Sequence, residues 1–285
     1  MQYILLVLIS LFSLKNCNSE KQPVNEPQLV HVENVSWQPT TVNLPAKEEE
    51  KSFRIEDALP SGYVKDGTAD YTVYIQQAIF NHDNLIFPAF PLKINDAGLK
   101  VGSNKTLKFL KGSELRLAPS DKGKYAIIDI RNAQNVTLID PVIIGDRAKH
   151  LGSSGEWGMG VNIVSSKNVT VYNARITDCW GDGIYIAGHP ERGPSKDVKI
   201  VNAYLKSNRR NGISIISVDG LELISPYSGY NDGIDPKCGI DIEPNKASDH
   251  IKNIRIVDAR TEYNPGTGIS VGINKLYGSA DQKVN

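Results

Sequence analysis

Two carboxylates stand one residue apart in the segment Cys-Gly-Ile-Asp-Ile-Glu-Pro-Asn, which covers residues 238–245. If this segment is a strand, Asp241 and Glu243 point to the same face, with their ends about 6–7 Å apart, because alternate side chains point to opposite faces. Such a pair could divide the acid and base roles of glycoside hydrolysis, or could bind a cation such as Ca²⁺ through oxygen ligands. A plain solvated strand face is the alternative, since exposed acidic side chains need no functional reason.

The segment Asp-Cys-Trp-Gly-Asp-Gly at residues 178–183 is a second candidate for a site. The ring of Trp180 could stack on the face of a sugar, and Asp182 could act with the acid pair in hydrolysis. The alternative is that Asp182 and Gly183 form an ordinary turn, because Asp-Gly is a common turn pair.

Two adjacent arginines, Arg209 and Arg210, suit a lyase that cleaves a uronate-containing polysaccharide by β-elimination. Such an enzyme must neutralise the uronate carboxylate and then remove the C5 proton with a base. The arginine pair could bind the carboxylate in bidentate fashion, and Tyr185 or His189 could transfer the proton. The alternative for the two arginines is a solvated turn.

The elements that must position these residues recur along the chain from about residue 100. One family of short β segments ends 23 to 33 residues apart and covers residues 104–107, 135–138, 168–171, 197–200, 220–223 and 253–256. Segments of a second family lie between them and open with Gly160, Gly183, Gly212, Gly239 and Gly268. One such unit cannot bury its apolar face alone, so the repeat predicts stacked coils. The predicted fold is all-β, a right-handed single-stranded parallel β-helix.

Stacking the glycine-led segments places their outward side chains in columns. The first column reads Asp129, Asn162, Tyr185, Ser214, Asp241 and Ser270, and the second reads Val164, Ala187, Ile216, Glu243 and Gly272. On this face we expect four residues to bind substrate, namely Asn162, Trp180, Asn211 and Ser214. Four coils extend about 15 Å, which suits a groove for several sugar rings.

A helical pattern over residues 66–81 precedes the repeats, with Asp70 as the expected N-cap and Tyr71, Ile75, Ala78 and Ile79 at helical spacing. We expect this helix to cover the open end of the stack. The motifs Asp-Gly-Thr-Ala-Asp (66–70), Ile-Gln-Gln-Ala-Ile (75–79) and Phe-Pro (87–88) resemble the start of the pectate-lyase-like β-helix superfamily, and the resemblance covers residues 55–280.

This resemblance implies a protein that acts on polysaccharides, although the superfamily includes lyases, hydrolases, epimerases and phage tailspikes. The chain departs from the polygalacturonase pattern, because it has no Asp-Asp pair and only Gly188-His189-Pro190 in place of Gly-His-Gly. It also lacks the Trp-Ile-Asp-His motif of the lyases and the Asp-Pro-His-Glu motif of the alginate epimerases. The reaction type is therefore left open between β-elimination, hydrolysis and non-catalytic glycan binding.

The N-terminus has an apolar stretch over residues 3–14 that is too short to span a bilayer but suits an export signal. Cys17 resembles the acylated cysteine of bacterial lipoproteins, which carries palmitate. We expect a signal peptide at 1–17, a tether at 18–50 and the β-helix domain at 51–285, in a lipoprotein of the outer membrane that faces the periplasm or the cell surface.

The formal net charge of zero gives no reason to expect a nucleic-acid partner. Cys179 and Cys238 are too far apart on stacked coils for a disulfide. The sequence after the last glycine-led segment shows no pattern of a C-terminal cap, so further coils or a partner chain in an oligomer could cover that end. The favoured interpretation is an exported lyase of an acidic polysaccharide.

Overall fold

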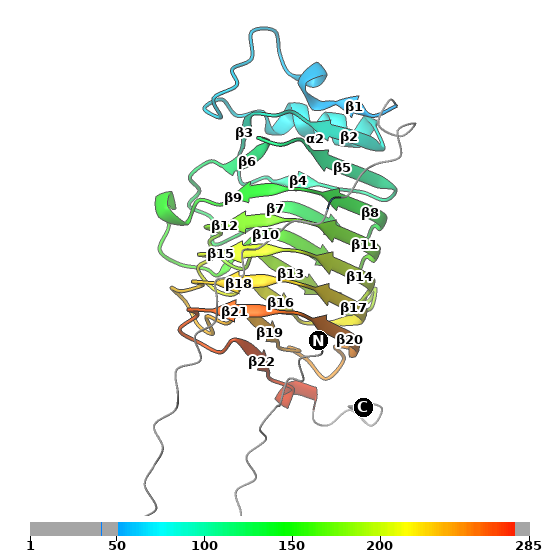
Figure 1. Ribbon diagram of the computed structural model, residues 1–285, viewed down its shortest axis with the longest axis vertical. Helices are drawn as coiled ribbons and strands as arrows, with labels where there is room; N and C mark the ends of the chain where they lie inside the picture. The colour runs from blue at the N-terminus through cyan, green and yellow to red at the C-terminus, as the bar shows by residue number, and fades with distance from the viewer. Residues whose placement is uncertain (1–40, 42–50, 277–285) are drawn as a thin grey trace, which may run out of the picture. The chain divides into compact units, whose positions relative to one another are not determined.

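The computed structural model describes residue 41 and residues 51–276, and the latter form a stack of parallel coils (Figure 1). Each coil passes through three sheets, here named A, B and C. Sheet A contains β1 (Phe53–Arg54), β2 (Asn84–Phe87), β5 (Lys105–Phe109), β8 (Gln134–Ile139), β11 (Lys167–Tyr172), β14 (Ser195–Val201), β17 (Val218–Ile224) and β20 (Ile251–Val257). Sheet B contains β3 (Pro91–Ile94), β6 (Glu114–Leu117), β9 (Val142–Ile144), β12 (Arg175–Thr177), β15 (Tyr204–Lys206), β18 (Tyr227–Gly229) and β21 (Arg260–Glu262). Sheet C contains β4 (Leu99–Lys100), β7 (Lys124–Arg131), β10 (Trp157–Val164), β13 (Ile184–Ala187), β16 (Ile213–Ile215), β19 (Ile240–Ile242) and β22 (Ile269–Val271).

The two repeated families of the sequence are the strands of sheets A and C, so the predicted parallel β-helix is confirmed. Sheet B is a third family that the repeat analysis did not identify, because its strands are mostly three residues long and share no leading residue. The register of sheet C pairs Asp129 with Asn162, Asn162 with Tyr185, Tyr185 with Ser214, and Ser214 with Asp241. The first predicted column is therefore correct coil by coil.

The core is a set of apolar ladders in which Ile184, Ile213 and Ile240 of sheet C are fully buried. The glycine that precedes each of these residues is required by close packing. A Cβ on Gly212 would lie 1.8 Å from the hydroxyl of Ser228 and 2.7 Å from a backbone oxygen of the next coil. Glycine therefore opens these strands because the turn from sheet B leaves no room for a side chain.

Asparagines hold the turn before sheet A in a left-handed conformation that β-branched residues avoid. The side-chain amide of Asn135 donates to Asn104 at 2.8 Å, and that of Asn168 donates to Asn135 at 2.9 Å. Asn253 lies outside this ladder and donates to Asp219 at 2.8 Å. The ladder of Asn104, Asn135 and Asn168 thus joins three successive coils and supports their register.

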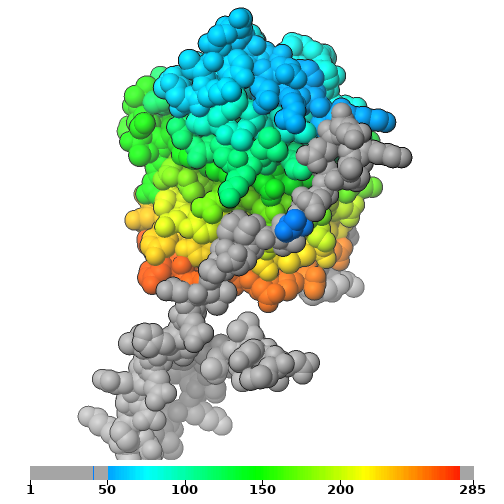
Figure 2. Space-filling view, turned by 45° about the horizontal axis from the view of Figure 1, so that its top comes forward, coloured from blue at the N-terminus to red at the C-terminus, as the bar shows by residue number. Residues whose placement is uncertain are grey.

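The capping helix α2 (Thr72–Asn81) buries the predicted face of Ile75, Ala78 and Ile79. Its N-cap is Tyr71, so the expectation of Asp70 as N-cap was wrong by one position, although Asp70 accepts a hydrogen bond from the N–H of Thr72 at 2.9 Å. The residues coloured blue and cyan, which include α2, form the top of the stack in Figure 2. Gln76 of α2 binds both the N–H and the C=O of Lys100, at 2.7 and 3.0 Å. The helix thereby satisfies the edge of β4, which is the outermost strand of sheet C.

Short 3-10 helices lie at η1 (Ile55–Ala58), η2 (Arg147–Lys149) and η3 (Asn274–Leu276). Among the residues that the structure describes, no helix has the length and apolar character needed to cross a membrane. The predicted signal peptide, Cys17 and almost all of the tether lie outside the described residues, as do residues 277–285.

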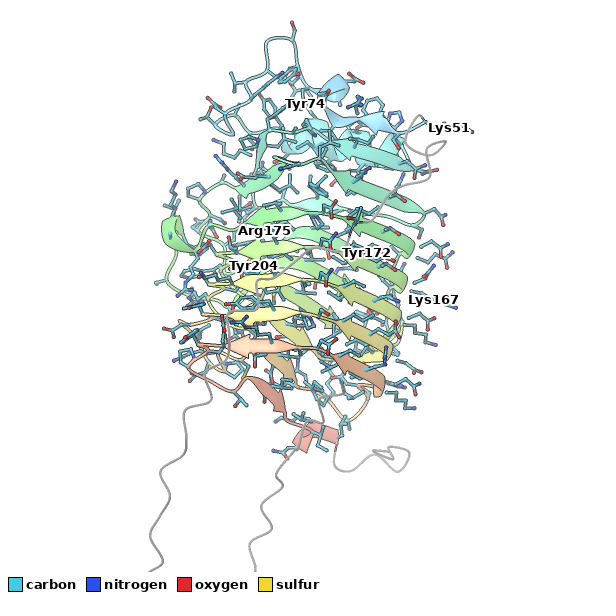
Figure 3. The ribbon with its side chains drawn as sticks, in the orientation of Figure 1. Lys51, Tyr74, Lys167, Tyr172, Arg175 and Tyr204 are labelled. Carbon is cyan, nitrogen blue, oxygen red and sulfur yellow. The ribbon has the colours of Figure 1, made fainter. Side chains whose placement is uncertain are left out.

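The outer face of sheet B is occupied by rings and cations that stack on one another. Tyr204 and Tyr227 stack with ring centroids 4.7 Å apart, and the guanidinium of Arg175 lies 4.8 Å from the ring of Tyr204. Arg175 and Tyr204 are labelled on neighbouring strands in Figure 3. These side chains therefore satisfy one another on sheet B.

Candidate functional site

Four carboxylates and one guanidinium gather on the outer face of sheet C and on the turns that lead into it. We call this group the acid–arginine cluster, and its members are Glu156, Asp182, Arg210, Asp241 and Glu243. Arg210 is the centre of the cluster. Its guanidinium lies 3.4 Å from Asp182, 3.1 Å from Glu243 and 3.8 Å from Glu156. Residues from four successive coils therefore meet at one cation, since these residues flank β10, β13, β16 and β19 in turn.

Asp182 is fully buried and occupies a turn position that the next coil fills with Asn211. One oxygen of Asp182 accepts the N–H of Asn211 at 3.0 Å, as the side-chain oxygen of Asn211 accepts the N–H of Cys238 at 2.7 Å. The second oxygen of Asp182 faces Arg210. Burial raises the pKa of Asp182 to about 6, against the opposing effects of Arg210, Ser214 and the Asn211 backbone. The turn requires only a hydrogen-bond acceptor at this position, which an asparagine could also supply. The negative charge of Asp182 therefore has its role in the ion pair with Arg210.

Asp241 and Glu243 lie one residue apart on the outer face of β19, as the strand repeat predicted. Asn211 donates to Asp241 at 3.2 Å, and Arg210 donates to Glu243 at 3.1 Å. Burial raises the pKa of Asp241 first, and the charge of Glu243 raises it further. Asp241 is only 2% exposed, whereas the side chain of Glu243 is 41% exposed. The inner carboxyl is therefore harder to ionise than an exposed one, and the outer carboxyl reaches solvent.

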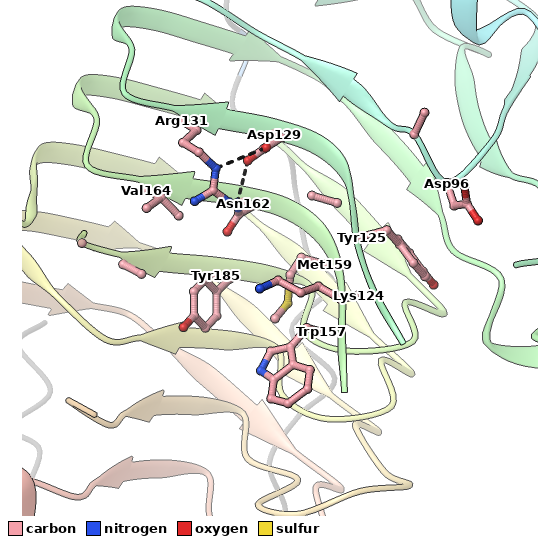
Figure 4. Close-up of a pocket in the computed structure, with 14 residues that line it drawn as sticks. Asp96, Lys124, Tyr125, Asp129, Arg131, Trp157, Met159, Asn162, Val164 and Tyr185 are labelled. Atoms are coloured by element: carbon pink, nitrogen blue, oxygen red, sulfur yellow. Dashed lines mark hydrogen bonds and ion pairs between the residues drawn. The ribbon is translucent and has the colours of Figure 1, made fainter. Parts of the chain in front are cut away.

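Tyr185 joins the cluster to a groove on the preceding coils. Burial raises the pKa of Tyr185 to about 12, with the charge of Asp182 as the next cause, so its phenol is neutral at physiological pH. Tyr185 lines a groove of about 520 Å³ that continues along β10 and β7 (Figure 4). The volume is in the range of sites that take small ligands.

The groove has an exposed aromatic wall and several charged side chains. Trp157 is 48% exposed and lines the groove together with Lys124 and Arg131. Asp129 and Asn162 lie on the floor, where Asn162 donates to Asp129 at 2.6 Å. Figure 4 shows Trp157 and Tyr185 on successive strands. An aromatic ring, polar groups and cations in one groove suit the faces and hydroxyls of a sugar chain.

The sequence predicted that Trp180 stacks on a sugar, but in the structure its ring is covered by other side chains. The ring of His150 stacks on it at 3.7 Å, and the guanidinium of Arg209 lies 3.7 Å from its ring centroid. Two groups at this distance cannot share one face, so both faces are covered. Trp180 is 9% exposed, and its indole N–H donates to Ser154 at 3.2 Å.

The predicted arginine pair does not converge on one acceptor. Arg209 donates to the backbone oxygen of Gly155 at 2.6 Å and lies on Trp180, whereas Arg210 turns toward the carboxylates. His189 is exposed in the loop after β13, where its ring accepts the N–H of Glu191 at 3.3 Å, and it does not line the groove. Asn211 and Ser214 are fully buried. The hydroxyl of Ser214 accepts hydrogen bonds from Arg210 and from the side-chain amide of Asn211. They shape the cluster, whereas Asn162 lies in the groove as predicted.

Sequence reasoning missed Glu156 and Trp157. The strand β10 begins at Trp157, three residues before the glycine that marks the equivalent strands. The available signal was an aromatic residue three positions before Gly160, which opens the glycine-led segment that carries the column residue Asn162.

Ca²⁺ fits the acid pair poorly. The guanidinium of Arg210 already contacts Glu243, so a cation would meet like charge where it would have to bind. Within the described residues there is no group of three or more His, Cys, Asp or Glu side chains placed to hold a metal ion.

Parallel strands in three sheets, with polar columns along one of them, define the class of β-helical proteins. The family model described as the right handed beta helix region matches residues 94–275, and the chain belongs to this family. The SPbeta prophage-derived uncharacterized protein YorA of Bacillus subtilis is 33% identical over 187 residues, which are 59% of this chain and 32% of that protein. The uncharacterized protein YclG of the same organism is 26% identical over 187 residues, which are 61% of this chain and 32% of that protein. The chain thus spans about a third of the length of these curated relatives.

Solved structures resemble the chain in fold. The pre-mature gene product 12 of bacteriophage phi29 matches with a TM-score of 0.64 and 19% identity, over 76% of this chain and 30% of that chain. A candidate glycosyl hydrolase from Parabacteroides merdae matches with a TM-score of 0.52 and 16% identity, over 74% of this chain and 95% of that chain. Likenesses at these identities show the β-helix and no more.

Proposed function

We propose that this protein cleaves a polysaccharide by hydrolysis of its glycosidic bonds at the acid–arginine cluster. The observation that carries the proposal is the convergence of three carboxylates on Arg210, at 3.1 to 3.8 Å, close to Tyr185, which lines a sugar-sized groove. A buried carboxyl and two partly exposed carboxylates around one cation can divide the roles of general acid and general base.

In this proposal Glu243 protonates the leaving glycosidic oxygen, and Asp241, whose pKa burial raises, is the neighbouring carboxyl that returns a proton to Glu243. Glu156 lies 3.8 Å from the Nε atom of Arg210 and removes a proton from the water that attacks the anomeric carbon. The C–O bond breaks as the water oxygen bonds to carbon, so one water is consumed for each bond cleaved. Arg210 positions both carboxylates, and Asp182 positions Arg210.

β-Elimination on a uronate polymer, the reaction favoured by the sequence, is the second candidate. Its support is the groove itself, where the cations Lys124 and Arg131 could face uronate carboxylates and Tyr185 could transfer a proton. Its weakness is that Arg210 is already shared by Asp182 and Glu243, and that Arg209 lies on Trp180. Non-catalytic glycan binding would use the same groove.

One assay separates these functions. The protein is incubated with a panel of neutral, amino-bearing and uronate polysaccharides. New reducing ends without ultraviolet absorbance support hydrolysis, and new ends with the absorbance of an unsaturated sugar support β-elimination. Retained binding with neither product would refute both enzymes. The variant Glu243→Gln, which keeps size and hydrogen bonding, should abolish product release while binding persists.

We also propose export and lipid anchoring at Cys17. A Cys17→Ser variant expressed in a Gram-negative host should move from the membrane fraction to the soluble fraction. The same distribution for both forms would refute the anchor. An oligomer that covers the C-terminal end is tested by the mass of the purified protein in solution.

A further inference from the structure

We propose that residues 37–44, Trp-Gln-Pro-Thr-Thr-Val-Asn-Leu, pack against an apolar column on the outer face of sheet A and so fasten this part of the chain to the β-helix. These residues belong to the tether that the sequence predicted at 18–50. The groove and the acid–arginine cluster lie on sheet C and its turns, so the contact is independent of the proposed cleavage.

The apolar column follows the edge of sheet A that turns into sheet B. The register pairs Ile139 with Tyr172, Tyr172 with Val201, and Val201 with Ile224. Leu138 is fully buried in the core, so its neighbour Ile139 and the partners of Ile139 point outward. Tyr172 is labelled in Figure 3, where sheet A turns into sheet B. Four apolar side chains thus stand in one row on an outer face, which is typical of a contact surface.

Two members of the apolar column are buried although they point away from the core. Ile139 is 2% exposed and Val201 is 8% exposed, and neither belongs to the apolar cluster of the core. The other outward column of the same strands contains Thr137, Thr170 and Lys199, which are partly exposed. The contrast within one sheet face indicates that the apolar column, and not the whole of sheet A, is the surface that needs a cover.

The chain enters the described fold at the top of this column. Arg54 of β1 pairs with Ile86, Ile86 pairs with Lys108, and Lys108 pairs with Ile139, so these residues stand in the same row. The acidic run Glu48–Glu50 comes shortly before Arg54, and the upper part of the row carries the cations Arg54 and Lys108. The charges of the entering chain and of the row are therefore complementary.

The connection is long enough for residues 37–44 to reach any part of the column. An extended chain covers about 3.3 Å per residue, so the stretch from Leu44 to Arg54 spans up to about 33 Å. The column from Ile86 to Ile224 crosses five strand spacings, or about 24 Å. A segment attached at this distance has a high effective concentration at the column, which favours it over a free partner or a second copy of the chain.

The composition of the segment suits an apolar surface. It carries Trp37, Val42 and Leu44, whereas residues 47–51, which follow it, are all charged. Ordering a segment costs conformational entropy, and burial of one tryptophan and two aliphatic side chains can offset that cost.

The test is the rate at which a maleimide labels a cysteine placed in the apolar column of the full chain, as Val201→Cys. Labelling is followed peptide by peptide by mass spectrometry, so that the native cysteines are counted apart. The substitution Trp37→Ser should raise the rate at position 201 about tenfold or more, because it removes the largest covering side chain. The matched control is Thr137→Cys in the polar column of the same sheet, where Trp37→Ser should leave the rate unchanged. Ile139→Cys is a second reporter in the apolar column.

Equal rates at position 201 with and without Trp37→Ser would overturn the inference, because another group would then cover the column. A Val201→Cys protein that reacts as fast as the Thr137→Cys protein would also overturn it, since the column would be open. A rate that falls as the protein concentration rises would assign the surface to a second copy and would refute the segment as its occupant. None of these measurements involves a polysaccharide, so the proposed function is judged separately.

Discussion

The charge of Asp182 can be removed without disturbing the turn that contains it. Its position is filled by Asn211 on the next coil, where an amide oxygen accepts the equivalent backbone N–H, that of Cys238. The substitution Asp182→Asn therefore keeps the acceptor and removes only the charge. We expect activity to fall about 10²-fold, because Arg210 loses the carboxylate that holds it and misplacement by about an ångström has that effect.

The effect of Asp182→Asn on stability should depend on pH, and its sign follows from burial. The pKa of Asp182 rises from its ordinary 3.8 to about 6 in the folded protein, and this rise corresponds to about 3 kcal/mol. The folded state holds the proton more tightly than the unfolded state does. The contribution of this group to stability is thus fully present below about pH 4 and is lost as the pH rises through about 6. Asparagine does not ionise, so the variant is spared this loss.

The measurement is the free energy of unfolding of the wild type and Asp182→Asn in denaturant at about pH 4 and pH 8. The difference between the two proteins should shift by about 3 kcal/mol in favour of the variant at the higher pH. The control Asp182→Ala also loses the turn hydrogen bond and should cost about 1–3 kcal/mol more than the asparagine variant at both pH values. A difference that stays constant within about 1 kcal/mol would refute the reasoning that an ionised, buried Asp182 destabilises the fold.

Three further perturbations test the site and the fold. Glu243→Gln should lower kcat by about 10²–10⁴-fold, measured as reducing ends from the best substrate, and a variant with near wild-type kcat would remove Glu243 from the mechanism. Trp157→Ala should raise the Kd for an oligosaccharide about tenfold and leave the Tm unchanged. Trp180→Ala should lower the free energy of unfolding by about 3–5 kcal/mol, because its ring is buried. The reverse pattern would mean that the two rings had been assigned the wrong roles. Gly212→Ala should destabilise the fold by at least about 1–3 kcal/mol in thermal unfolding, because its Cβ would clash with the neighbouring coil. Gly102→Ala is the matched control, since its Cβ would meet nothing within 4 Å, and equal losses in both variants would contradict the packing argument.

The column from Asp129 to Ser270 could be predicted from sequence because glycine marks the start of most sheet C strands and the side-chain period of a strand is two. Once the glycines are aligned, the register follows without further information. The same reasoning could not find Glu156 or Trp157, since β10 begins before its glycine.

The directions in which side chains of the turns point could not be predicted from the sequence, and the reason is physical. Arg209 and Arg210 are adjacent, yet one lies on Trp180 and the other among carboxylates, because consecutive residues of a turn have different backbone angles. Trp180 was misjudged for the same cause, since the loop of residues 145–156, which covers it with His150, has no repeat pattern. Strand periodicity locates columns of residues, while contacts made by loops depend on packing in three dimensions.

The bonds between successive asparagine turns have a consequence for how such a molecule can change in length. Since each coil meets its neighbours through the same few contacts, an added copy of one coil would find both of its interfaces already prepared. Duplication of the segment from Gly183 to Asn211 would lengthen the stack by one strand spacing, about 4.8 Å, and insert a second Tyr185 together with a second Arg210. The architecture thus permits reach along a polymer to be altered by whole steps.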